Sequence, residues 1–400
     1  MKPTALDKRI KRRITARRHT FFAACAPGLS RVCMHELQEL SKTLPLDAGT
    51  LSMVTGGMEF QGQIHDAYAA NLCLRSPSRI LMRIKRFRAE NFRILEKQLK
   101  DMDWELYLKP GVHIAIQASS QQSRLYHGGA LAQRARDIIG LQFDQPLTDA
   151  SGDSTGQGAA NHTIYLRGDK DWFDVSLDTS GELLYRRGIK PDVGAAPLRE
   201  TLAVAILGMA GYTGEEPLLD PMCGSGTFSL EGVMIRRNIP PGFFRSFAFQ
   251  DWPCFSQGRW NHMKGAAQAL IQQNRDTMIV ASDRDASMLS ALKATLCTYP
   301  LLSGIRVIQQ DFFDLAPGHL VETPGVVVLN PPYGIRLGTR EDMGRLYLEI
   351  GKKLGRDFRG WKIGVVLPDP GLADRFPFPV CLTPLFHGGL ELSVATGRVP

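Results

Sequence analysis

Three segments in the C-terminal half of the sequence carry residues suited to binding a nucleoside. The segment 220–227 reads DPMCGSGT, where two glycines before a helical pattern let a ligand approach the backbone and free N–H groups. Asp283 ends the next apolar run, where its two oxygens can accept both hydroxyls of a ribose. Asp311 ends a third run, where it can accept from an adenine amino group, with Phe312 beside it as a stacking face. Together they predict a pocket for an adenosine-containing molecule.

Each of these signals has a plainer interpretation when taken alone. The glycine loop could be a tight turn, and an Asp at a strand end is more often a helix N-cap than a ligand. The loop lacks the G-K-[ST] of a P-loop and the full dinucleotide pattern, and Ser225 does not stand in a hydrolase G-x-S-x-G. Asp283 follows Gly226 by 57 positions instead of about 20, so an insertion is expected, with the Pro-, Gly- and aromatic-rich 238–260 as the candidate.

A fourth segment ends a strand in an unusual way. Residues 326–329 are apolar and are followed by Asn330, Pro331, Pro332 and Tyr333. Proline has no backbone N–H and a fixed φ, so the two prolines must lie beyond the sheet ladder. They would hold the amide and the aromatic ring rigidly at the rim of the sheet. The plainer interpretation is a proline-rich strand cap.

These polar residues belong to a regular pattern that begins near residue 190. Apolar runs there alternate with helical patterns, and each run ends in Asp or Asn. The alternation predicts a mostly parallel α/β sheet with polar residues at the carboxyl ends of its strands, where ligands bind. The last residues predict a hairpin around Gly388 and Gly389. Before residue 190 the strand and helix patterns are short and are interrupted by a polar, Gly-rich loop at 149–162.

Composition excludes several classes of protein. The chain has 400 residues, of which 44% are hydrophobic, and no apolar run approaches the roughly 20 residues that span a bilayer. The apolar stretch 21–26 is shorter than the about 7–15 residues of a signal peptide core. The seven cysteines form no C-x-x-C and no zinc-type spacing, so we expect reduced thiols, no metal site and a cytoplasmic protein.

The positive charge is concentrated at the N-terminus. The formal net charge is +8, and most of it comes from Lys and Arg in residues 1–20. A basic arm on a near-neutral body suggests a phosphate backbone as partner, although a disordered solubilising tail would look the same. A second basic stretch, 75–93, predicts a half-buried strand with a cationic face, or a plain solvated one.

The motifs DPMCGSGTF, SDRD, QQDFFD and LNPPYG occur in this order and resemble class I S-adenosylmethionine-dependent methyltransferases that act on amines. The segments APLRETLAVAIL and FQDWP and the N-terminal half are similar to THUMP-domain RNA methyltransferases, most closely the RlmL-like group that methylates guanine N2 of bacterial large-subunit rRNA. The resemblance implies a Rossmann-like domain with a mostly parallel seven-stranded sheet, preceded by a ferredoxin-like and THUMP region. The basic arm has no counterpart, and the second catalytic domain of some members is absent.

The resemblance also implies boundaries and site residues. We expect a disordered basic arm at 1–20, an RNA-binding region at 21–165, a linking segment at 166–189 and a methyltransferase domain at 190–400. The catalytic candidates are Asn330, Pro331, Pro332 and Tyr333. The candidates for binding S-adenosylmethionine are Asp220, Pro221, Cys223, Gly224, Ser225, Gly226, Thr227, Asp283, Asp311, Phe312 and Asn330.

The implied reaction gives a role to the residues that follow the strand at 326–329. If the oxygens of Asn330 and Pro331 each accept one N–H of an exocyclic amine, the nitrogen lone pair is directed at the methyl group. Tyr333 would stack on the flipped-out base. The expected activity is methylation of guanine N2 in 23S rRNA during rRNA processing. The alternatives are guanine N2 of tRNA, adenine N6, and an RNA-binding protein with a vestigial cofactor pocket.

Overall fold

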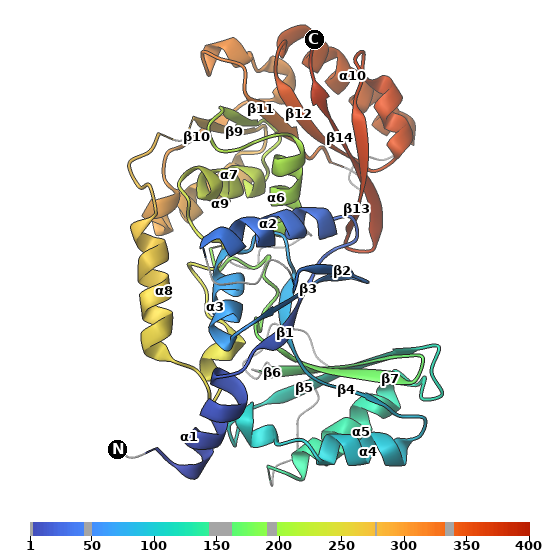
Figure 1. Cartoon of the computed structure of the whole chain (residues 1–400). Coiled ribbons are helices and arrows are strands. Elements are labelled where there is room, and N and C mark those ends of the chain that lie inside the picture. The colour runs from blue at the N-terminus through green and yellow to red at the C-terminus, as the bar shows by residue number, and fades with distance from the viewer. Residues whose placement is uncertain (1–2, 44–49, 144–161, 190–197, 277, 333–339) are drawn as a thin grey trace. The chain divides into compact units, whose positions relative to one another are not determined.

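The computed structural model describes residues 3–43, 50–143, 162–189, 198–276, 278–332 and 340–400 (Figure 1). The chain forms two compact units that are interleaved in sequence. Unit 1 comprises Met1–Cys25, Cys33–Leu184 and Arg245–Lys264. Unit 2 comprises Ala26–Val32, Tyr185–Phe244 and Gly265–Pro400.

Unit 1 is built on a seven-stranded sheet with the order β2-β3-β1-β4-β7-β6-β5. Its strands are β1 (His19–Ala24), β2 (Ser52–Val54), β3 (Gly57–Gly62), β4 (Arg79–Arg88), β5 (Ile114–Gln121), β6 (His162–Asp169) and β7 (Trp172–Asp178). Neighbouring strands are antiparallel except β5 and β6, which are parallel. The predicted basic strand is confirmed as β4, whose first half is more deeply buried than its second.

The helices of this region are α1 (Ala5–Ile10), η1 (Lys11–Thr15), α2 (Ser30–Thr43), α3 (Ile64–Cys73), α4 (Phe92–Lys100), η3 (Trp104–Leu106) and α5 (Gly128–Gly140). Helices α4 and α5 pack side by side across one face of the sheet (Figure 1). Phe21, Met82 and Leu177 face one another across β1, β4 and β7, and all three are fully buried. This row of cross-strand partners forms part of the core of unit 1.

The expectation of a disordered N-terminal arm is wrong for residues 5–15, which form α1 and η1. Ile10 and Ile14 lie on one face of these helices and are buried, because an i, i+4 apolar pair gives even a basic segment a side that packs. Arg9 and Arg13 both form ion pairs with Asp103. The charge of this segment is therefore partly neutralised within unit 1.

The expected linking segment, 166–189, is also wrong, because its residues 166–169 and 172–178 lie in strands β6 and β7 of the sheet. The turn between these strands is Lys170-Asp171, and both residues have positive φ. Hairpin turns of this kind usually contain Asn or Gly, so the sequence carried no turn signal at this point. The 21–165 boundary of the RNA-binding region accordingly ends too early.

The segment 245–264 lies between the glycine loop and Asp283 in sequence, yet it packs within unit 1. Phe249 stacks on Tyr68 of α3 with ring centroids 4.3 Å apart, and Trp260 meets Tyr68 edge-on at 6.4 Å. The segment contains η4 (Ala248–Asp251) and the first part of α8 (Gln257–Ala269). The predicted insertion thus supplies a second aromatic core to unit 1.

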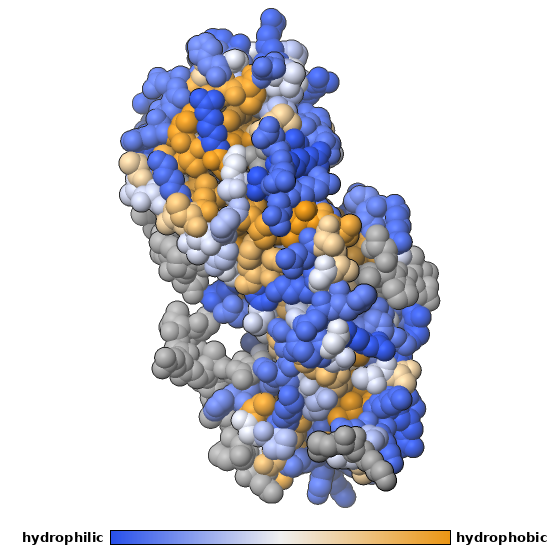
Figure 2. Space-filling model, turned by 90° about the vertical axis from the view of Figure 1, so that its left-hand side faces the viewer, coloured by the Kyte–Doolittle hydropathy of each residue, from blue (hydrophilic) through white to orange (hydrophobic). Residues whose placement is uncertain are grey.

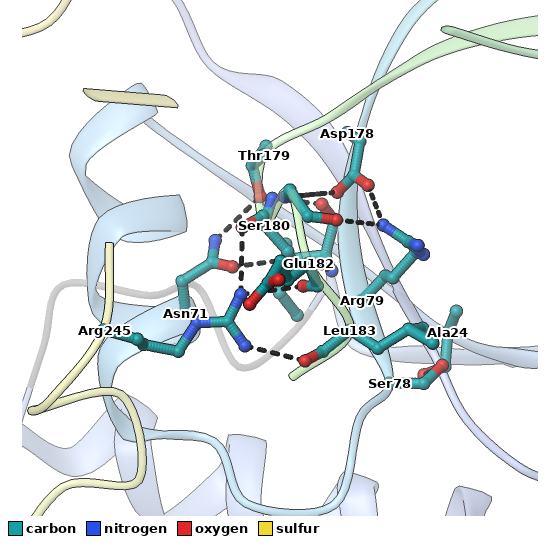
Figure 3. Close-up of polar contacts among 12 residues, drawn as sticks. Ala24, Asn71, Ser78, Arg79, Asp178, Thr179, Ser180, Glu182, Leu183 and Arg245 are labelled. Atoms are coloured by element: carbon teal, nitrogen blue, oxygen red, sulfur yellow. Dashed lines mark hydrogen bonds and ion pairs between the residues drawn. The ribbon is translucent and has the colours of Figure 1, made fainter. Parts of the chain in front are cut away.

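A polar network, buried at Asn71, Thr179 and Ser180 and partly exposed at Arg245, ties this segment to the end of β7 (Figure 3). Arg245 donates to the carbonyl oxygens of Leu183 at 2.7 Å, Glu182 at 2.8 Å and Ser180 at 3.3 Å. The amide of Asn71 donates to Thr179 Oγ1 at 2.7 Å and accepts from Ser180 Oγ at 2.6 Å. Because these groups satisfy one another's hydrogen bonds, they fix the turn after β7 in one conformation.

Unit 2 contains the predicted mostly parallel sheet, with the order β10-β9-β8-β11-β12-β14-β13. Its strands are β8 (Leu218–Asp220), β9 (Ile279–Asp283), β10 (Ile305–Gln309), β11 (Val326–Leu329), β12 (Lys362–Leu367), β13 (Cys381–His387) and β14 (Leu390–Arg398). Strands β8 to β12 run parallel, and β14 is antiparallel to both β12 and β13. The predicted terminal hairpin is β13–β14.

The helices of unit 2 are α6 (Glu200–Met209), α7 (Thr227–Arg236), α9 (Ala286–Thr298) and α10 (Arg340–Asp357). Strand β11 is buried along its whole length, and α10 contributes Tyr347, Ile350 and Leu354 to the core beside it. The predicted mostly parallel α/β sheet is therefore confirmed. In the described residues no helix is long and apolar enough to cross a membrane. Apolar residues reach the surface in places among mainly hydrophilic ones (Figure 2).

His162 gives unit 1 a pH-dependent stability. It lies at the start of β6 with 1% of its surface exposed, and neither ring nitrogen has a hydrogen-bond partner among the described residues. Burial lowers the pKa of His162 to about 4. The unfolded chain, with an ordinary histidine, therefore binds more protons than the folded one between about pH 6.5 and 4.

We expect the free energy of unfolding to fall by about 2–3 kcal/mol as the pH drops from 7 to 4 because of this residue. Urea denaturation at several pH values measures it, and His162→Phe should remove that part of the decrease. Exposed His262 gives the control variant, His262→Gln, which should keep it. An NMR titration of the unmodified protein in which the His162 ring protonates near pH 6.5 would contradict the prediction.

Candidate functional site

The carboxyl ends of the parallel strands bring the predicted residues to one edge of the unit 2 sheet. Asp220 ends β8, Asp283 ends β9, and Asn330 follows β11. The strand order reverses between β8 and β11, so the connections after them leave in opposite directions. In open α/β sheets ligands bind at this topological switch point.

The glycine loop between β8 and α7 requires its glycines. Gly224 and Gly226 have φ angles of 51° and 77°, a left-handed conformation that other residues adopt at a cost. A Cβ at position 226 would also lie 2.6 Å from the side chain of Leu292. The Cys223 N–H donates to the carbonyl oxygen of Ser282 at 3.0 Å, which joins the loop to β9. The loop therefore presents backbone at the sheet edge in a fixed shape.

Asp220 supports this loop through hydrogen bonds to α7. Its Oδ2 accepts hydrogen bonds from the backbone N–H of Ser229 at 3.2 Å and from Ser229 Oγ at 2.8 Å. The residue has none of its surface exposed, and these two hydrogen bonds position the start of α7. Among the other loop candidates, Gly224 and Ser225 are partly exposed, whereas Pro221, Cys223 and Thr227 are buried.

Asp283 joins the loop to the second strand through its carboxylate. Its Oδ2 accepts from the Gly224 N–H at 2.9 Å, and its Oδ1 accepts from the Asp285 N–H at 3.0 Å. A carboxylate oxygen can accept more than one hydrogen bond, so both oxygens retain acceptor capacity. The two N–H groups hold the carboxylate in place, so that its remaining acceptor sites lie at the partly exposed edge of the sheet.

Asp311 and Phe312 have different surroundings. Asp311 is partly exposed and caps the short helix η6 (Phe312–Asp314) by accepting from the Phe313 N–H at 2.9 Å. Phe312 has 1% of its surface exposed and packs in the core against Phe358, with ring centroids 5.9 Å apart. The expectation that Phe312 offers a stacking face is wrong, because the first residue of this turn points inward.

Asn330 provides a buried acceptor at the switch point. Its Oδ1 is inaccessible to solvent and has no hydrogen-bond partner within the described part of the chain. Pro331 is buried and Pro332 is exposed, while Tyr333 lies outside the described residues. An unsatisfied buried acceptor costs about 1–3 kcal/mol, and a ligand that brings an N–H donor would remove that cost.

Four supporting residues were not predicted from the sequence. Arg284 lies 4.0 Å from the carboxylate of Asp311, and only its place between two aspartates could have suggested it. Lys353 of α10 donates to the carbonyl oxygens of Phe313 at 2.9 Å and Leu315 at 2.7 Å, which anchors the turn after β10.

Below the glycine loop, Arg187 forms a fully buried ion pair at 2.9 Å with Glu231 of α7. Nothing in the spacing of these residues along the chain predicts the contact. The described residues contain no group of His, Cys, Asp or Glu that could hold a metal ion.

Comparison with known proteins supports this geometry. Residues 187–375 match the profile of the RMKL-like methyltransferase domain, and residues 20–81 match that of the RlmL ferredoxin-like domain. A Synechocystis protein with the provisional description of RNA methyltransferase is 33% identical over 94% of this chain and 95% of its own length. The ribosomal RNA large subunit methyltransferase K/L of Methylococcus capsulatus is 32% identical over 86% of this chain but only 46% of its own length. This chain thus spans about half the length of that relative.

Solved structures agree with these sequence matches. SMU.472, described as a methyltransferase and solved with SAH, has a TM-score of 0.81 at 26% identity, and the match covers 96% of this chain and 98% of that one. TrmN from Thermus thermophilus, with a TM-score of 0.67 at 18% identity over 96% of this chain and all of its own, shares the fold. The predicted ferredoxin-like and methyltransferase halves are both confirmed, and the chain belongs to the RlmL-like family of RNA methyltransferases.

Proposed function

We propose that this protein transfers a methyl group from S-adenosylmethionine to the exocyclic N2 amine of a guanine in RNA, and that its substrate is large-subunit rRNA. The observation that carries the proposal is the buried, unpartnered Oδ1 of Asn330 at the switch point. An acceptor kept in this state suits a substrate that brings its own N–H donor. The remaining residues of the site fit the cofactor and the base.

The residues at the ends of β8, β9 and β10 fit S-adenosylmethionine. Asp283 keeps acceptor capacity for ribose hydroxyls, and the partly exposed Asp311 for the adenine amino group. Gly224 and Ser225 present the loop backbone without bulky side chains. The related structure of SMU.472 with SAH supports a cofactor of this kind. When bound, the cofactor supplies an electrophilic methyl group on a sulfonium.

The residues after β11 fit the amine. Asn330 Oδ1 and the Pro331 carbonyl oxygen would each accept one N–H, which orients the lone pair and stabilises the positive charge that develops on nitrogen. The prolines limit backbone motion, so the acceptors need little reorganisation during transfer. Tyr333 is proposed to stack on the base. No general base is needed, because the proton can leave the product after transfer.

Guanine in rRNA is favoured over the alternatives by the family relationship. Several relatives named ribosomal RNA large subunit methyltransferase K/L match 86–95% of this chain at 29–32% identity. A solved relative from Listeria monocytogenes, 25% identical, is described as a predicted N6-adenine-specific DNA methylase, so adenine N6 remains the competing chemistry. Guanine in tRNA is the competing substrate. The intact Asp283, Asp311 and Asn330 argue against a vestigial pocket.

The test of this proposal is the identity of the methylated nucleoside. RNA from a strain that lacks the protein is incubated with purified protein and labelled S-adenosylmethionine, then digested and analysed by chromatography and mass spectrometry. N2-methylguanosine from 23S rRNA is the expected product. Labelled adenosine would show that the base is adenine, and labelled tRNA would show that the substrate is tRNA; both results would leave the amine mechanism standing. A methyl group on ribose or on a ring carbon would overturn that mechanism.

Replacing Asp283 tests the cofactor contact. Asp283→Ala removes the proposed acceptors for the ribose and should weaken S-adenosylmethionine binding by about 1.5–3 kcal/mol, the range for hydrogen bonds to charged groups. Isothermal titration calorimetry measures the change. Asp314→Ala, which alters an exposed carboxylate after β10, is the matched control and should bind normally. Unchanged affinity in folded Asp283→Ala would remove this residue from the site.

Replacing Asn330 separates binding from transfer. Asn330→Ala deletes one acceptor but keeps both prolines, so cofactor affinity should persist while the transfer rate falls about 10²–10³-fold, as for other preorganised polar groups. Asn330→Asp retains an acceptor oxygen and should lose less. Single-turnover kinetics with saturating RNA gives the rate. A wild-type rate in Asn330→Ala would show that this side chain does not hold the amine.

A further inference from the structure

Three connections meet at one end of the unit 1 sheet, and we call them the sheet tip: 88–91 after β4, 121–127 after β5, and 169–172 between β6 and β7. Asp171 joins all three. Its N–H donates to Ser123 Oγ at 3.0 Å, its carbonyl accepts from the Ala89 N–H at 2.9 Å, and its Oδ1 accepts from the Arg124 N–H at 2.7 Å. The tip is therefore one connected structure and not three independent loops.

The tip contains backbone strain. Gln122, Lys170 and Asp171 have φ angles of 49°, 50° and 64°, which place three non-glycine residues in the left-handed region. This conformation is unfavourable for residues with a Cβ, and Asn-Gly in the β6–β7 turn would relieve most of the strain. Glycine at 171, however, would lose the carboxylate that fixes Arg124. The strained residue is thus the one that holds the tip together.

The tip also exposes aromatic rings. Tyr126 and Trp172 are 75% and 45% exposed, and they are the only large aromatic side chains exposed to this degree in the described part of unit 1. The guanidinium of Arg86 lies over the Trp172 ring at 5.6 Å from its centroid. A stable core needs neither ring at the surface, so their exposure points to a ligand that stacks.

The charges at the tip are balanced. Arg88 and Arg124 both pair with Glu90, and Arg86 lies 3.8 Å from Asp174. These guanidinium groups remain more than half exposed, so they can stack and donate in their own plane. A surface for duplex backbones would instead carry cations without partners. Rings and neutralised guanidinium planes suit the faces of unpaired bases.

We infer that the sheet tip binds unpaired nucleotides of the RNA substrate, with their bases stacked on Trp172 and Tyr126. The inference rests on the proposed function for the presence of RNA, and it goes further by naming where and how a single-stranded part of that RNA is held. Asp171 is a positioning residue, because it fixes the loop that carries Arg124 and Tyr126. The ligand is recognised by base stacking and little by charge.

The test compares a fluorescein-labelled single-stranded RNA of twelve nucleotides with the same strand in a duplex, using fluorescence anisotropy and the full chain. Trp172→Ala and Tyr126→Ala should each weaken binding of the single strand about 5- to 100-fold, as expected for loss of base stacking, with little effect on the duplex. Trp172→Phe and Tyr126→Phe should bind nearly as well as the wild type. Leu141, 76% exposed after the opposite end of α5, gives the matched control Leu141→Ala, with no effect.

Asp171 is tested by two substitutions. Asp171→Gly relieves strain yet removes the Oδ1 acceptor, so thermal stability should hold while affinity for the single strand falls. Asp171→Asn keeps an acceptor oxygen and tolerates the left-handed conformation, so it should bind normally. Equal loss of affinity in both variants would show that Asp171 does not act through this contact.

The combined variant Trp172→Ala/Tyr126→Ala separates this inference from the proposed function. Its affinity for S-adenosylmethionine should equal that of the wild type. Wild-type affinity for the single strand, or an equal loss for single strand and duplex, would overturn the inference about the tip. If the wild-type protein methylates RNA while this variant binds the single strand normally, the inference fails and the proposed function stands. If the wild-type protein labels no RNA nucleoside, the proposed function fails.

Discussion

The helices that follow β8 and β11 leave the sheet toward opposite sides, and the gap between their starting points is where the candidate site forms. Each right-handed crossover places its helix on one face of the sheet. Where the strand order reverses, two neighbouring strands send their helices to opposite faces, and the carboxyl ends of these strands stay open between them. Asp283 and the glycine loop stand on one side of this position, and Asn330 stands on the other. Cofactor and amine acceptors therefore come from different strands and are set at a fixed separation by the hydrogen bonds of the sheet.

Several hydrogen bonds and one ion pair hold the loops of the site in a fixed position. The carboxylates of Asp220 and Asp283 are each tied to backbone N–H groups, and Lys353 holds two carbonyl oxygens of the turn after β10. The buried pair of Arg187 and Glu231 fixes α7 from below. Removing either partner of such a buried pair typically lowers the free energy of unfolding by about 3–5 kcal/mol. Arg187 and Glu231 therefore constrain α7 strongly, although neither is proposed to touch a ligand.

The part of the site that could be predicted from sequence is the part with a local signature. Asp283 and Asn330 stand directly after apolar runs, and parallel strands bring such ends together whatever the rest of the chain does. Phe312 was misplaced because one residue decides which way a short turn faces. Ile10 and Ile14 were overlooked among basic residues, and Tyr68 and Phe249 meet although they are far apart in the sequence. Contacts between residues far apart in the chain leave no local pattern in a single sequence. Tyr333 lies outside the described residues, so the prediction for its ring stays a prediction.

The interleaving of the two units has a consequence for synthesis on the ribosome. Tyr68 and the sheet of unit 1 are translated long before the aromatic residues at 247–260 that cover α3. At about 5–20 residues per second, completing the segment to Lys264 after β7 takes roughly 4–17 s, far longer than elementary folding steps. During that interval the nascent chain carries an apolar surface that only its own later part can cover, which makes chaperone binding useful at this stage. The same arrangement prevents either unit from being transferred to another gene by a single recombination event.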